Sequence, residues 1–288
     1  MKRINNKILG LGVDIGGSHI ASALVDLQQR CIIPGTQVRS FVNAGGAADA
    51  IMDTWINTLR KSVKGYEDHF DRIGIAMPGP FDYEQGISLI KGNHKYESLY
   101  GMNIKEALSF RLAIPAACVG FSNDAGCFLK GEVSIMDGAT CNTVTGLTLG
   151  TGLGAALYKN KAAVDVNRWC MPFGEGIAED YISTRWFVQR YFQLSGKKVK
   201  GVKELVSLHA SDPAVQKIFS EFAANLGAFL VICVEEDHPD RIILGGNIAK
   251  ASGYFLPQLE AYLLRHKIRV PIQLARLGEN ALIIGALA

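Results

Sequence analysis

The sequence predicts an α/β protein built from two related domains, and three observations support this. The chain has 288 residues, and because single domains commonly hold roughly 100–200 residues, two domains are the default. Apolar runs of strand length alternate with segments of helical periodicity. A strand–glycine turn–strand unit occurs twice, since Val13–Ser18 lies over Leu147–Gly152 when the two halves are aligned. We therefore place the domains at residues 1–133 and 134–279, with the crossover within 133–142.

In the first half, apolar runs bounded by glycine, proline or polar residues predict the strands, and apolar residues spaced three and four apart predict the helices. Residues 47–63 illustrate the helical spacing, with Ile51, Trp55, Ile56, Leu59 and Val63 on one face. The expected strands are 8–14, 20–26, 31–41, 72–77 and 116–119, and the expected helices are 47–63, 104–112 and 124–132.

The second half repeats this plan. Its clearest helix begins at Asp212-Pro213, an N-cap residue followed by proline at the first helical position. The apolar stripe from Val215 to Cys233 predicts that this helix lies in the core. The expected strands are 144–149, 154–158 and 241–244, and further helices are expected over 247–264 and 280–288.

Composition and charge exclude several classes of protein. Apolar residues make up 48% and charged residues 20% of the chain, which predicts an ordered protein with a sizeable core. The net charge of +3 is too small to indicate nucleic-acid binding, and the basic run 197–200 is interpreted as a solvated loop. The longest apolar stretches, 226–234 and 281–288, are shorter than a membrane-spanning helix, so no membrane partner is expected.

The six cysteines form no C-x-x-C pair and show no metal-ligand spacing. Most of them lie in apolar surroundings, as reduced buried thiols do. We therefore expect a cytoplasmic protein.

The first glycine turn is Gly16-Gly17-Ser18, which follows a predicted buried strand ending near Asp14. A bound phosphate needs converging N–H donors, and side chains at such a turn would block its approach. A carboxylate beside the turn would repel a bare phosphate, so the expected partner of Asp14 is Mg²⁺, held through water. A plain turn is the alternative reading of such a motif.

Two further turns follow apolar strands in the second half. Gly150-Thr151-Gly152 offers a second phosphate-binding turn, with a hydroxyl in place of the carboxylate. Gly245-Gly246 ends a strand and is expected to open a helix, where its flat backbone could lie against a nucleotide base. Each turn alone is a weak signal, and the prediction depends on all three occurring in this order.

These motifs resemble a known family. Leu11–Ser18 (LGVDIGGS) is similar to the first phosphate motif of the ASKHA superfamily, which includes actin and sugar kinases. Four further motifs resemble those of the ROK family of sugar kinases: Gly74–Pro80 (GIAMPGP), Ser122–Ala125 (SNDA), Leu149–Gly154 (LGTGLG) and Leu244–Gly246 (LGG). The motifs span nearly the whole chain. Met77–Pro80 and Asn123–Ala125 are more specific to the family than the glycine turns are.

The resemblance implies two RNase H-like (actin-like ATPase) domains with ATP and a sugar in the interdomain cleft. It also implies that the helix at 280–288 returns to the N-terminal domain and that the protein is a homodimer. The implied activity is an ATP- and Mg²⁺-dependent hexose kinase that phosphorylates glucose or a relative, such as an N-acetylhexosamine, mannose or fructose, at the primary hydroxyl. The choice of hexose, of ATP or polyphosphate as donor, and of subunit number stays open.

Phosphoryl transfer to a sugar needs a carboxylate that accepts the hydroxyl proton. Asp124 is the candidate base, because a helix N-terminus favours the ionised form. The alternative is that Asn123-Asp124 only caps the helix. The resemblance assigns Asn123 to a sugar hydroxyl and Asp124 to the sugar and the proton.

The chain departs from the family where a Gly-Glu-x-Gly-His segment and a cysteine-rich zinc motif are expected. Only Cys170 remains there, and the histidine is missing. Because one cysteine cannot make a tetrahedral site, no zinc is expected. Gly176–Ser183 still resembles the end of the motif, which maps Glu179 onto the sugar-binding glutamate. Glu175 either binds the sugar as well or lies in the first turn of a helix.

A polar and aromatic loop lies between Pro80 and Asn103, and such residues suit sugar binding. Asn93 is the residue chosen from it as a sugar ligand. His94 either replaces the missing family histidine or is merely solvated.

Two other classes compete with the kinase. A ROK transcriptional regulator would bind sugar without strong catalysis, but it needs an N-terminal DNA-binding domain. Because the first phosphate motif begins at residue 11, no such domain is expected here. An actin-like or chaperone ATPase would need neither Asn123-Asp124 nor Met77–Pro80.

Overall fold

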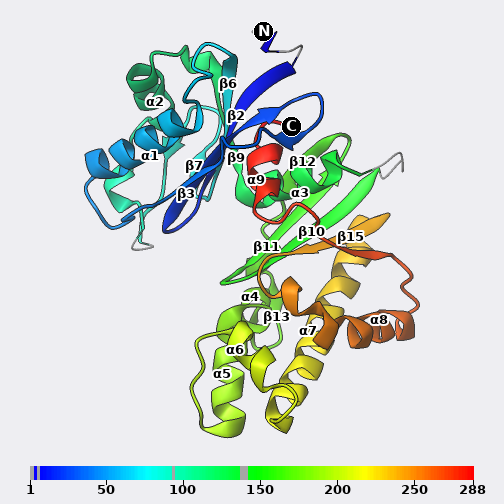
Figure 1. The fold of residues 1–288 in the computed structure, drawn as a ribbon. Coiled ribbons are helices and arrows are strands. Elements are labelled where there is room, and N and C mark those ends of the chain that lie inside the picture. The colour runs from blue at the N-terminus through cyan, green and yellow to red at the C-terminus, as the bar shows by residue number, and fades with distance from the viewer. Residues whose placement is uncertain (1–2, 5–6, 93–94, 137–141) are drawn as a thin grey trace. The chain divides into compact units, whose positions relative to one another are not determined.

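The structure is a computed structural model that describes residues 3–4, 7–92, 95–136 and 142–288 (Figure 1). The chain divides into two compact units, which are described separately. Unit 1 is Met1–Asp137 together with Glu279–Ala288, and unit 2 is Gly138–Gly278. The C-terminal segment therefore belongs with the N-terminal half, and residues 137–141 of the expected crossover lie outside the described residues.

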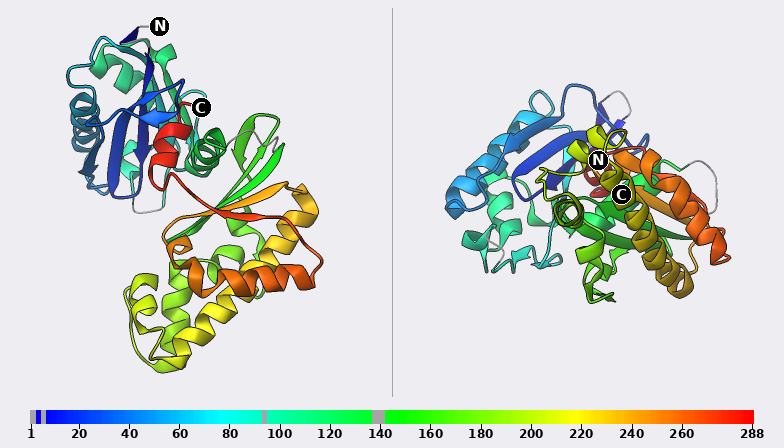
Figure 2. Two further views of the ribbon diagram at one scale, coloured as in Figure 1. Left: turned by 45° about the vertical axis from the view of Figure 1, so that its right-hand side comes forward. Right: turned by 90° about the horizontal axis from the view of Figure 1, so that it is seen from below.

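Unit 1 is built around one twisted sheet. In chain order it contains β1 (Arg3–Ile4), β2 (Lys7–Ile15), β3 (His19–Asp26), β4 (Cys31–Ile32), β5 (Val38–Phe41), α1 (Ala48–Ser62), β6 (Phe70–Met77), β7 (Phe81–Asp82), β8 (Ile87–Ser88), α2 (Ile104–Leu112), β9 (Val119–Asn123), α3 (Asp124–Ser134) and α9 (Asn280–Gly285). The sheet order is β4-β3-β2-β6-β9, with β1 beside β2 and β5 beside β3. Helices α1 and α2 lie on one side of the sheet, and α3 and α9 lie on the other (Figures 1 and 2).

Unit 2 also has one main sheet, and most of its helices pack together at one end. In chain order it contains β10 (Thr143–Leu149), β11 (Leu153–Lys159), β12 (Ala162–Asp165), β13 (Pro172–Phe173), β14 (Gly176–Ile177), α4 (Ala178–Tyr181), α5 (Thr184–Ser195), α6 (Val202–Leu208), α7 (Pro213–Asp237), β15 (Arg241–Gly245), α8 (Leu256–Arg265) and β16 (Ile272–Leu274). The sheet order is β12-β11-β10-β15-β16. The core lies between this sheet and the helices, with α7 at its centre.

The two sheets share one topology, which confirms the internal repeat predicted from the sequence. In unit 1, β2 pairs antiparallel with β3 and parallel with β6, and in unit 2, β10 pairs antiparallel with β11 and parallel with β15. The registers correspond as well. Asp14 lies opposite Ala76 on its parallel neighbour, and Thr148 lies opposite Gly245.

Two short segments of unit 1 differ from the predicted strands. The strand expected over 31–41 is split into β4 and β5, because Gly35 at φ +80° turns the chain between them. The strand expected over 116–119 begins as a 3₁₀ turn at Ala116–Cys118, and the strand itself runs on to Asn123.

The helix expected over 247–264 is wrong as a single element. Residues Ala249–Tyr254 form a 3₁₀ helix, and α8 starts at Leu256 after a break at Phe255, where φ is −133°. Pro257 explains the break, because proline lacks the N–H that a continuous helix would need there. Gly246 itself leads into a turn and does not open the α-helix expected there.

Helix α9 packs against glycines of the unit 1 sheet and of α3. A Cβ atom built on Gly12 would lie 2.1 Å from the carbonyl oxygen of Ile283, and one on Gly74 would lie 2.1 Å from that of Ala286. On α3, a Cβ at Gly131 would lie 2.1 Å from the carbonyl oxygen of Ala281. The helix backbone therefore rests directly on the sheet and on α3, which explains why the C-terminus belongs to unit 1.

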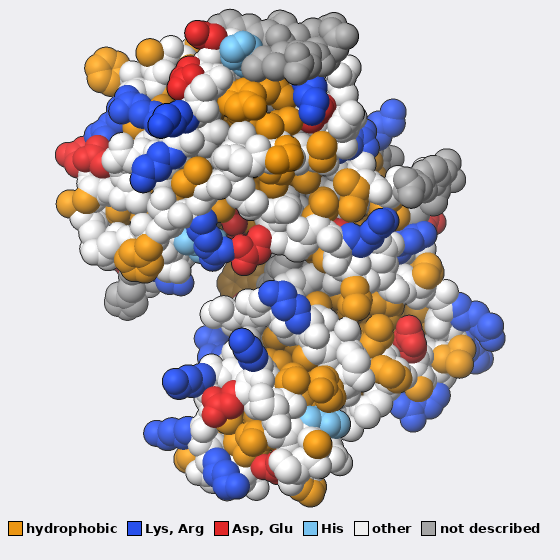
Figure 3. Space-filling view, in the orientation of Figure 1, with side chains coloured by type: hydrophobic (Ala, Val, Ile, Leu, Met, Phe, Trp, Pro, Cys, Tyr) orange, Lys and Arg blue, Asp and Glu red, His pale blue; other side chains and the backbone are white. Residues whose placement is uncertain are grey.

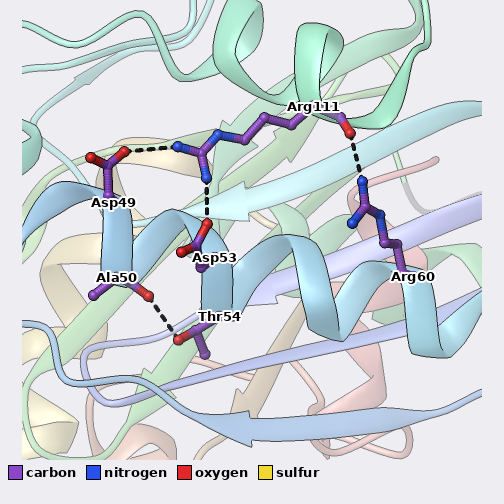
Figure 4. Close-up of polar contacts among 6 residues, drawn as sticks. All are labelled: Asp49, Ala50, Asp53, Thr54, Arg60 and Arg111. Carbon is purple, nitrogen blue, oxygen red and sulfur yellow. Dashed lines mark hydrogen bonds and ion pairs between the residues drawn. The ribbon is translucent and has the colours of Figure 1, made fainter.

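On the opposite side of that sheet, Arg111 at the end of α2 joins α1 to α2 (Figure 4). Its guanidinium donates to Asp53 at 2.6 Å and to Asp49 at 2.8 Å, and its carbonyl oxygen accepts from Arg60 at 3.0 Å. Because the two aspartates are largely exposed, these ion pairs contribute little to stability.

Helix α7 is longer than the apolar stretch used to argue against a membrane span. By length and composition alone it could cross a bilayer, with a mean hydropathy of 1.6 in its most apolar window. Half of that window is buried within the protein, and residues from Val215 to Cys233 form the core of unit 2. This burial is typical of the core helix of a globular domain.

Candidate active site

Asp14 lies near the end of β2 on the face of the unit 1 sheet that α3 and α9 cover. Side chains alternate between faces along a strand, and Gly12, two residues earlier, is the one that contacts α9. The Asp14 side chain is 10% exposed, and its Oδ2 lies 3.5 Å from Nε2 of His19. Sequence reasoning left His19 unassigned, and the structure places it beside the carboxylate.

The first glycine hairpin joins β2 to β3. The N–H of Gly16 donates to the carbonyl oxygen of His19 at 2.9 Å. A Cβ on Gly16 would lie 2.5 Å from the His19 ring, and one on Gly17 would lie 2.7 Å from Nζ of Lys95. Ser18 is exposed, and its carbonyl oxygen accepts from the N–H of Val42. A side chain at Gly16 would collide with the His19 ring, whereas one at Gly17 would displace only the end of the Lys95 side chain. Without Cβ atoms at either position, the backbone of the turn can be approached by a ligand.

Asn123 and Asp124 occupy the junction of β9 and α3. Asn123 is the N-cap residue, and its Oδ1 accepts from the N–H groups of Ala125 at 2.8 Å and Gly126 at 3.2 Å. Its amide nitrogen donates to the hydroxyl of Tyr83 at 3.3 Å. The capping role considered for the pair thus belongs to Asn123, whereas Asp124 is the first residue of the helix.

The unit 1 sheet brings Asp14 and Asp124 to one edge and one face. The parallel strands β2, β6 and β9 end together, with Asp14 opposite Ala76 and Ala76 opposite Ser122. Asp124 begins α3, which covers the face to which Asp14 points. The pKa of the buried Cys127 thiol is raised to about 12, mainly by burial; Lys130 lowers it, and the charges of Asp124 and Asp14 raise it, so the thiol lies near both acids. Two carboxylates and a glycine hairpin therefore meet within unit 1.

The second glycine hairpin, in unit 2, joins β10 to β11. The N–H of Gly150 donates to the carbonyl oxygen of Gly152 at 3.0 Å. The carbonyl oxygen of Gly150 accepts from both the N–H and the hydroxyl of Thr184, each at 2.8 Å. Thr151 is exposed at the tip. The hairpin is thus held from one side by α5 and presents its threonine to solvent.

Glu179 supports this second hairpin. Its Oε2 accepts from the N–H of Leu153 at 3.0 Å, and its Oε1 accepts from Arg185 at 3.0 Å. A Cβ on Gly152 would lie 2.3 Å from Oε2, so glycine is needed for this contact. Sequence reasoning assigned Glu179 to the sugar and missed this local role. A carboxylate has about four acceptor sites, so a sugar contact is still available to it.

Gly245 and Gly246 pack against the start of the second hairpin. Gly246 has φ +86°, and a Cβ there would lie 2.3 Å from the carbonyl oxygen of Leu149. That oxygen accepts from the N–H of Ile248 at 2.9 Å. Gly246 therefore serves a close backbone approach, and the flat surface expected of Gly245-Gly246 for a nucleotide base stays a prediction.

A cavity of about 920 Å³ lies beside the second hairpin within unit 2. Near the turns it is lined by Thr151, Thr184 and Asn247. Its lining also carries three positive charges and one negative charge, from Lys200, Lys203, Lys250 and Glu204. Figure 3 shows lysines and arginines gathered on the α5 and α6 part of unit 2. The signal in the sequence was the basic run 197–200, whose last lysine is exposed but also lines this cavity.

The remaining predicted residues have different outcomes. Glu175 lies in the turn between β13 and β14, before α4 begins, so its placement in the first turn of a helix is wrong. Its N–H donates to the hydroxyl of Tyr181 at 3.0 Å. Asn93 and His94 lie outside the described residues.

Among the described residues, no group of three or more His, Cys, Asp and Glu side chains is arranged so that it could hold a metal ion. Cys170 is exposed, and its thiol contacts the carbonyl oxygen of Asn167. The absence of zinc stays a prediction.

Two sheets of one topology, each with a glycine hairpin, give this chain a two-domain α/β fold of the actin-like (ASKHA) type. Within this class, residues 10–288 match the ROK family, and the chain belongs to that family.

Three relatives illustrate its range. The chain is 25% identical over 308 residues to the N-acetylgalactosamine kinase AgaK of Shewanella sp. (strain ANA-3), covering 96% of this chain and 94% of that protein. Its fold is similar to that of a ROK family glucokinase from Streptomyces griseus in complex with glucose and AMPPNP, with a TM-score of 0.75 and 22% identity, covering 96% of this chain and 97% of the other. It is also similar to a ROK family transcriptional regulator, a homolog of the E. coli MLC protein, with a TM-score of 0.78 and 17% identity, covering 98% of this chain and 77% of the other.

Proposed function

We propose that this protein is an ATP-dependent hexose kinase that transfers the terminal phosphoryl group of ATP to the primary hydroxyl of glucose or a related hexose. The observation that carries the proposal is the arrangement in unit 1. Asp124 and Asp14 lie at one edge and one face of the sheet, beside a hairpin of bare glycine backbone. Membership of the ROK family supports it.

Asp124 acts as the general base in this mechanism. A hexose hydroxyl is a poor nucleophile, so a carboxylate that accepts its proton as the oxygen attacks phosphorus accelerates transfer. The position at the start of α3 favours the ionised carboxylate. The sugar is proposed to accept and donate hydrogen bonds at four further side chains, Asn93, Asn123, Glu175 and Glu179. Asp124 contacts the sugar through the hydroxyl that it deprotonates.

The two hairpins are proposed to bind the phosphates, Gly16-Gly17-Ser18 in unit 1 and Gly150-Thr151-Gly152 in unit 2. Asp14 suits Mg²⁺, because Mg²⁺ prefers oxygen ligands and is commonly held by one or two carboxylates, water and substrate phosphates. The low exposure of Asp14 and its place beside the first hairpin fit this role. The ion would supply charge neutralisation of the phosphates.

The cavity of unit 2 is proposed to take the nucleotide. Its lysines suit an anionic ligand, and Gly245-Gly246 leads into the segment containing Asn247, which lines it. Its volume of about 920 Å³ lies within the range of small-molecule sites.

The decisive experiment is a coupled assay of ADP release with ATP, Mg²⁺ and a panel of hexoses that includes N-acetylhexosamines. We expect release that depends on the hexose, and the best hexose names the substrate. A preference for an N-acetylhexosamine over glucose would indicate a substrate class like that of the Shewanella N-acetylgalactosamine kinase. Tight sugar binding without turnover would favour a sugar-binding regulator, and turnover without any sugar would contradict the kinase.

Metal removal tests whether the activity depends on Mg²⁺ or on zinc. We expect EDTA to abolish activity and added Mg²⁺ to restore it fully, because Mg²⁺ neutralises the phosphates. Elemental analysis of the purified protein should find no stoichiometric zinc, since Cys170 alone cannot form a tetrahedral site. Recovery only on addition of Zn²⁺ would contradict both expectations.

The cytoplasmic location and the homodimer also stay proposals. Within the described part of the chain, Cys31, Cys118, Cys127, Cys170 and Cys233 are free thiols, which fits a reducing compartment. Light scattering of the purified protein would measure the number of subunits.

A further inference from the structure

Lys95 lies directly against the first glycine hairpin. A Cβ atom on Gly17 would lie 2.7 Å from Nζ of Lys95 and 3.2 Å from each of its Cδ and Cε atoms. The end of the lysine side chain therefore occupies the space that the missing side chain of Gly17 leaves. Neither the sequence motifs nor the proposed mechanism assigns a role to this ammonium group.

The neighbouring Tyr96 fixes this part of the chain against the hairpin. Tyr96 is 1% exposed, and its hydroxyl donates to the carbonyl oxygen of Gly16 at 2.6 Å. Its N–H donates to the carbonyl oxygen of Ala44 at 2.7 Å, and its ring meets that of Trp55 edge to face at 5.6 Å. Burial, and then the charge of Asp14, raise the pKa of Tyr96, so the hydroxyl stays a donor at neutral pH.

The backbone of Tyr96 is left-handed, with φ +57°. This conformation is strained for a non-glycine residue and persists where the surroundings determine it. Here the buried ring and the two hydrogen bonds of Tyr96 hold it. The backbone of the residue before it is consequently held at the hairpin, and from there the exposed Lys95 side chain reaches Gly17.

The charges around the hairpin explain what this ammonium can do. Asp14 places a carboxylate on one side, with His19 next to it. A carboxylate repels phosphate, whereas a lysine ammonium is a compact positive charge with three donors that binds phosphate oxygens. Lys95 adds such a charge where a phosphate would meet the glycine backbone.

We propose that Lys95 is a further catalytic residue, which binds the phosphoryl group during its transfer at the first hairpin. The proposal rests on the proposed kinase function. In the step, the bond from the sugar oxygen to the terminal phosphorus forms and the bond from that phosphorus to the β–γ bridging oxygen breaks. Asp124 takes the hydroxyl proton, ADP leaves, and Lys95 keeps its protons. Its charge stabilises the equatorial oxygens of the phosphoryl group.

The test compares Lys95→Met, which removes the charge and keeps the length, with Lys95→Arg, which keeps the charge. Lys91→Met is the matched control, because Lys91 lies in the same loop and its Nζ lies 5.3 Å from the ring centroid of Tyr100. We expect Lys95→Met to lower kcat by about 10²-fold with little change in the KM of the hexose. Lys95→Arg should retain most of the activity, and Lys91→Met should match the unchanged protein.

A binding measurement accompanies the kinetics. Calorimetry in the presence of Mg²⁺ should show that Lys95→Met lowers the affinity for AMPPNP and leaves the affinity for ADP unchanged, because Lys95 contacts the terminal phosphate. Equal loss for both nucleotides, unchanged AMPPNP affinity with unchanged kcat, or a change confined to the KM of the hexose would overturn the proposal. If the unaltered protein shows no hexose-dependent ADP release, the proposed function fails, while the comparison of AMPPNP with ADP still tests Lys95.

Discussion

The variant Asp124→Asn is expected to lower kcat by about 10²–10⁴-fold, the usual contribution of a general base. Asparagine has nearly the same shape as aspartate but cannot accept the hydroxyl proton. The fold should be retained, because the N-cap of α3 is Asn123 and an asparagine oxygen could still accept from the N–H of Ala125, as Oδ1 of Asp124 does at 2.9 Å. Steady-state kinetics with a saturating hexose measures the effect.

A charge-matched control is available in the same unit. Asp53→Asn also removes one negative charge, from the exposed ion pair with Arg111 (Figure 4). Such a pair contributes roughly 0–1 kcal/mol, so this variant should keep its kcat and its melting temperature. Nucleotide affinity should be unchanged in both variants. If Asp124→Asn retains wild-type turnover, another group must be the base.

Gly12→Ala is expected to destabilise unit 1 by about 1–3 kcal/mol or more, the cost of inserting a methyl group into a packed core. The new Cβ would lie 2.1 Å from the carbonyl oxygen of Ile283 and 2.8 Å from its Cγ2 atom. A backbone oxygen cannot rotate away, so α9 must move off the sheet. Since a two-domain protein need not unfold in one step, differential scanning calorimetry should be combined with limited proteolysis of the C-terminus.

Gly120→Ala is the matched control, because Gly120 lies in β9 of the same sheet and a new Cβ there would lie 3.9 Å from the nearest contacting atom, the carbonyl oxygen of Ile73. Its melting temperature should be close to that of the unchanged protein. The proteolysis result distinguishes the mechanism: Gly12→Ala should expose the end of the chain, and Gly120→Ala should not. Equal protection of the C-terminus in both variants would contradict the docking of α9 described above.

Features that depend on a few neighbouring residues could be predicted from the sequence. The hairpins after β2 and β10 follow from glycines placed directly after apolar runs, and the start of α7 follows from Asp212, whose Oδ1 accepts from the N–H of Ala214 at 2.9 Å. The repeat of topology was visible because both halves use this local signal. Where a proline interrupts an apolar pattern, as at Pro257, periodicity alone predicted one helix and the structure has two elements.

The family resemblance extended these local signals to residue roles, and the structure adds contacts that the roles did not include. Asn123 is a helix cap whatever else it binds, and Glu179 holds the second hairpin through the N–H of Leu153. The cap was one of the two interpretations that the sequence left open, whereas the contact of Glu179 leaves no trace in the spacing of residues along the chain. The N-cap is a local feature, but the same Asn-Asp pair is compatible with capping and with sugar binding. The hydrogen bond of Glu179 to Leu153 depends on how α4 lies against the start of β11.

The sequence by itself determined the α/β class, the order of the elements, the glycine hairpins and the identity of the acids, since these follow from local conformational preference and periodicity. Only the tertiary structure decided that Asp14 and Asp124 share an edge and a face, that Lys95 fills the space over Gly17, and that α9 rests on Gly12. These arrangements depend on strand register and on close packing between segments far apart in the chain. Such contacts form only when the complete unit is assembled, so no short stretch of sequence encodes them.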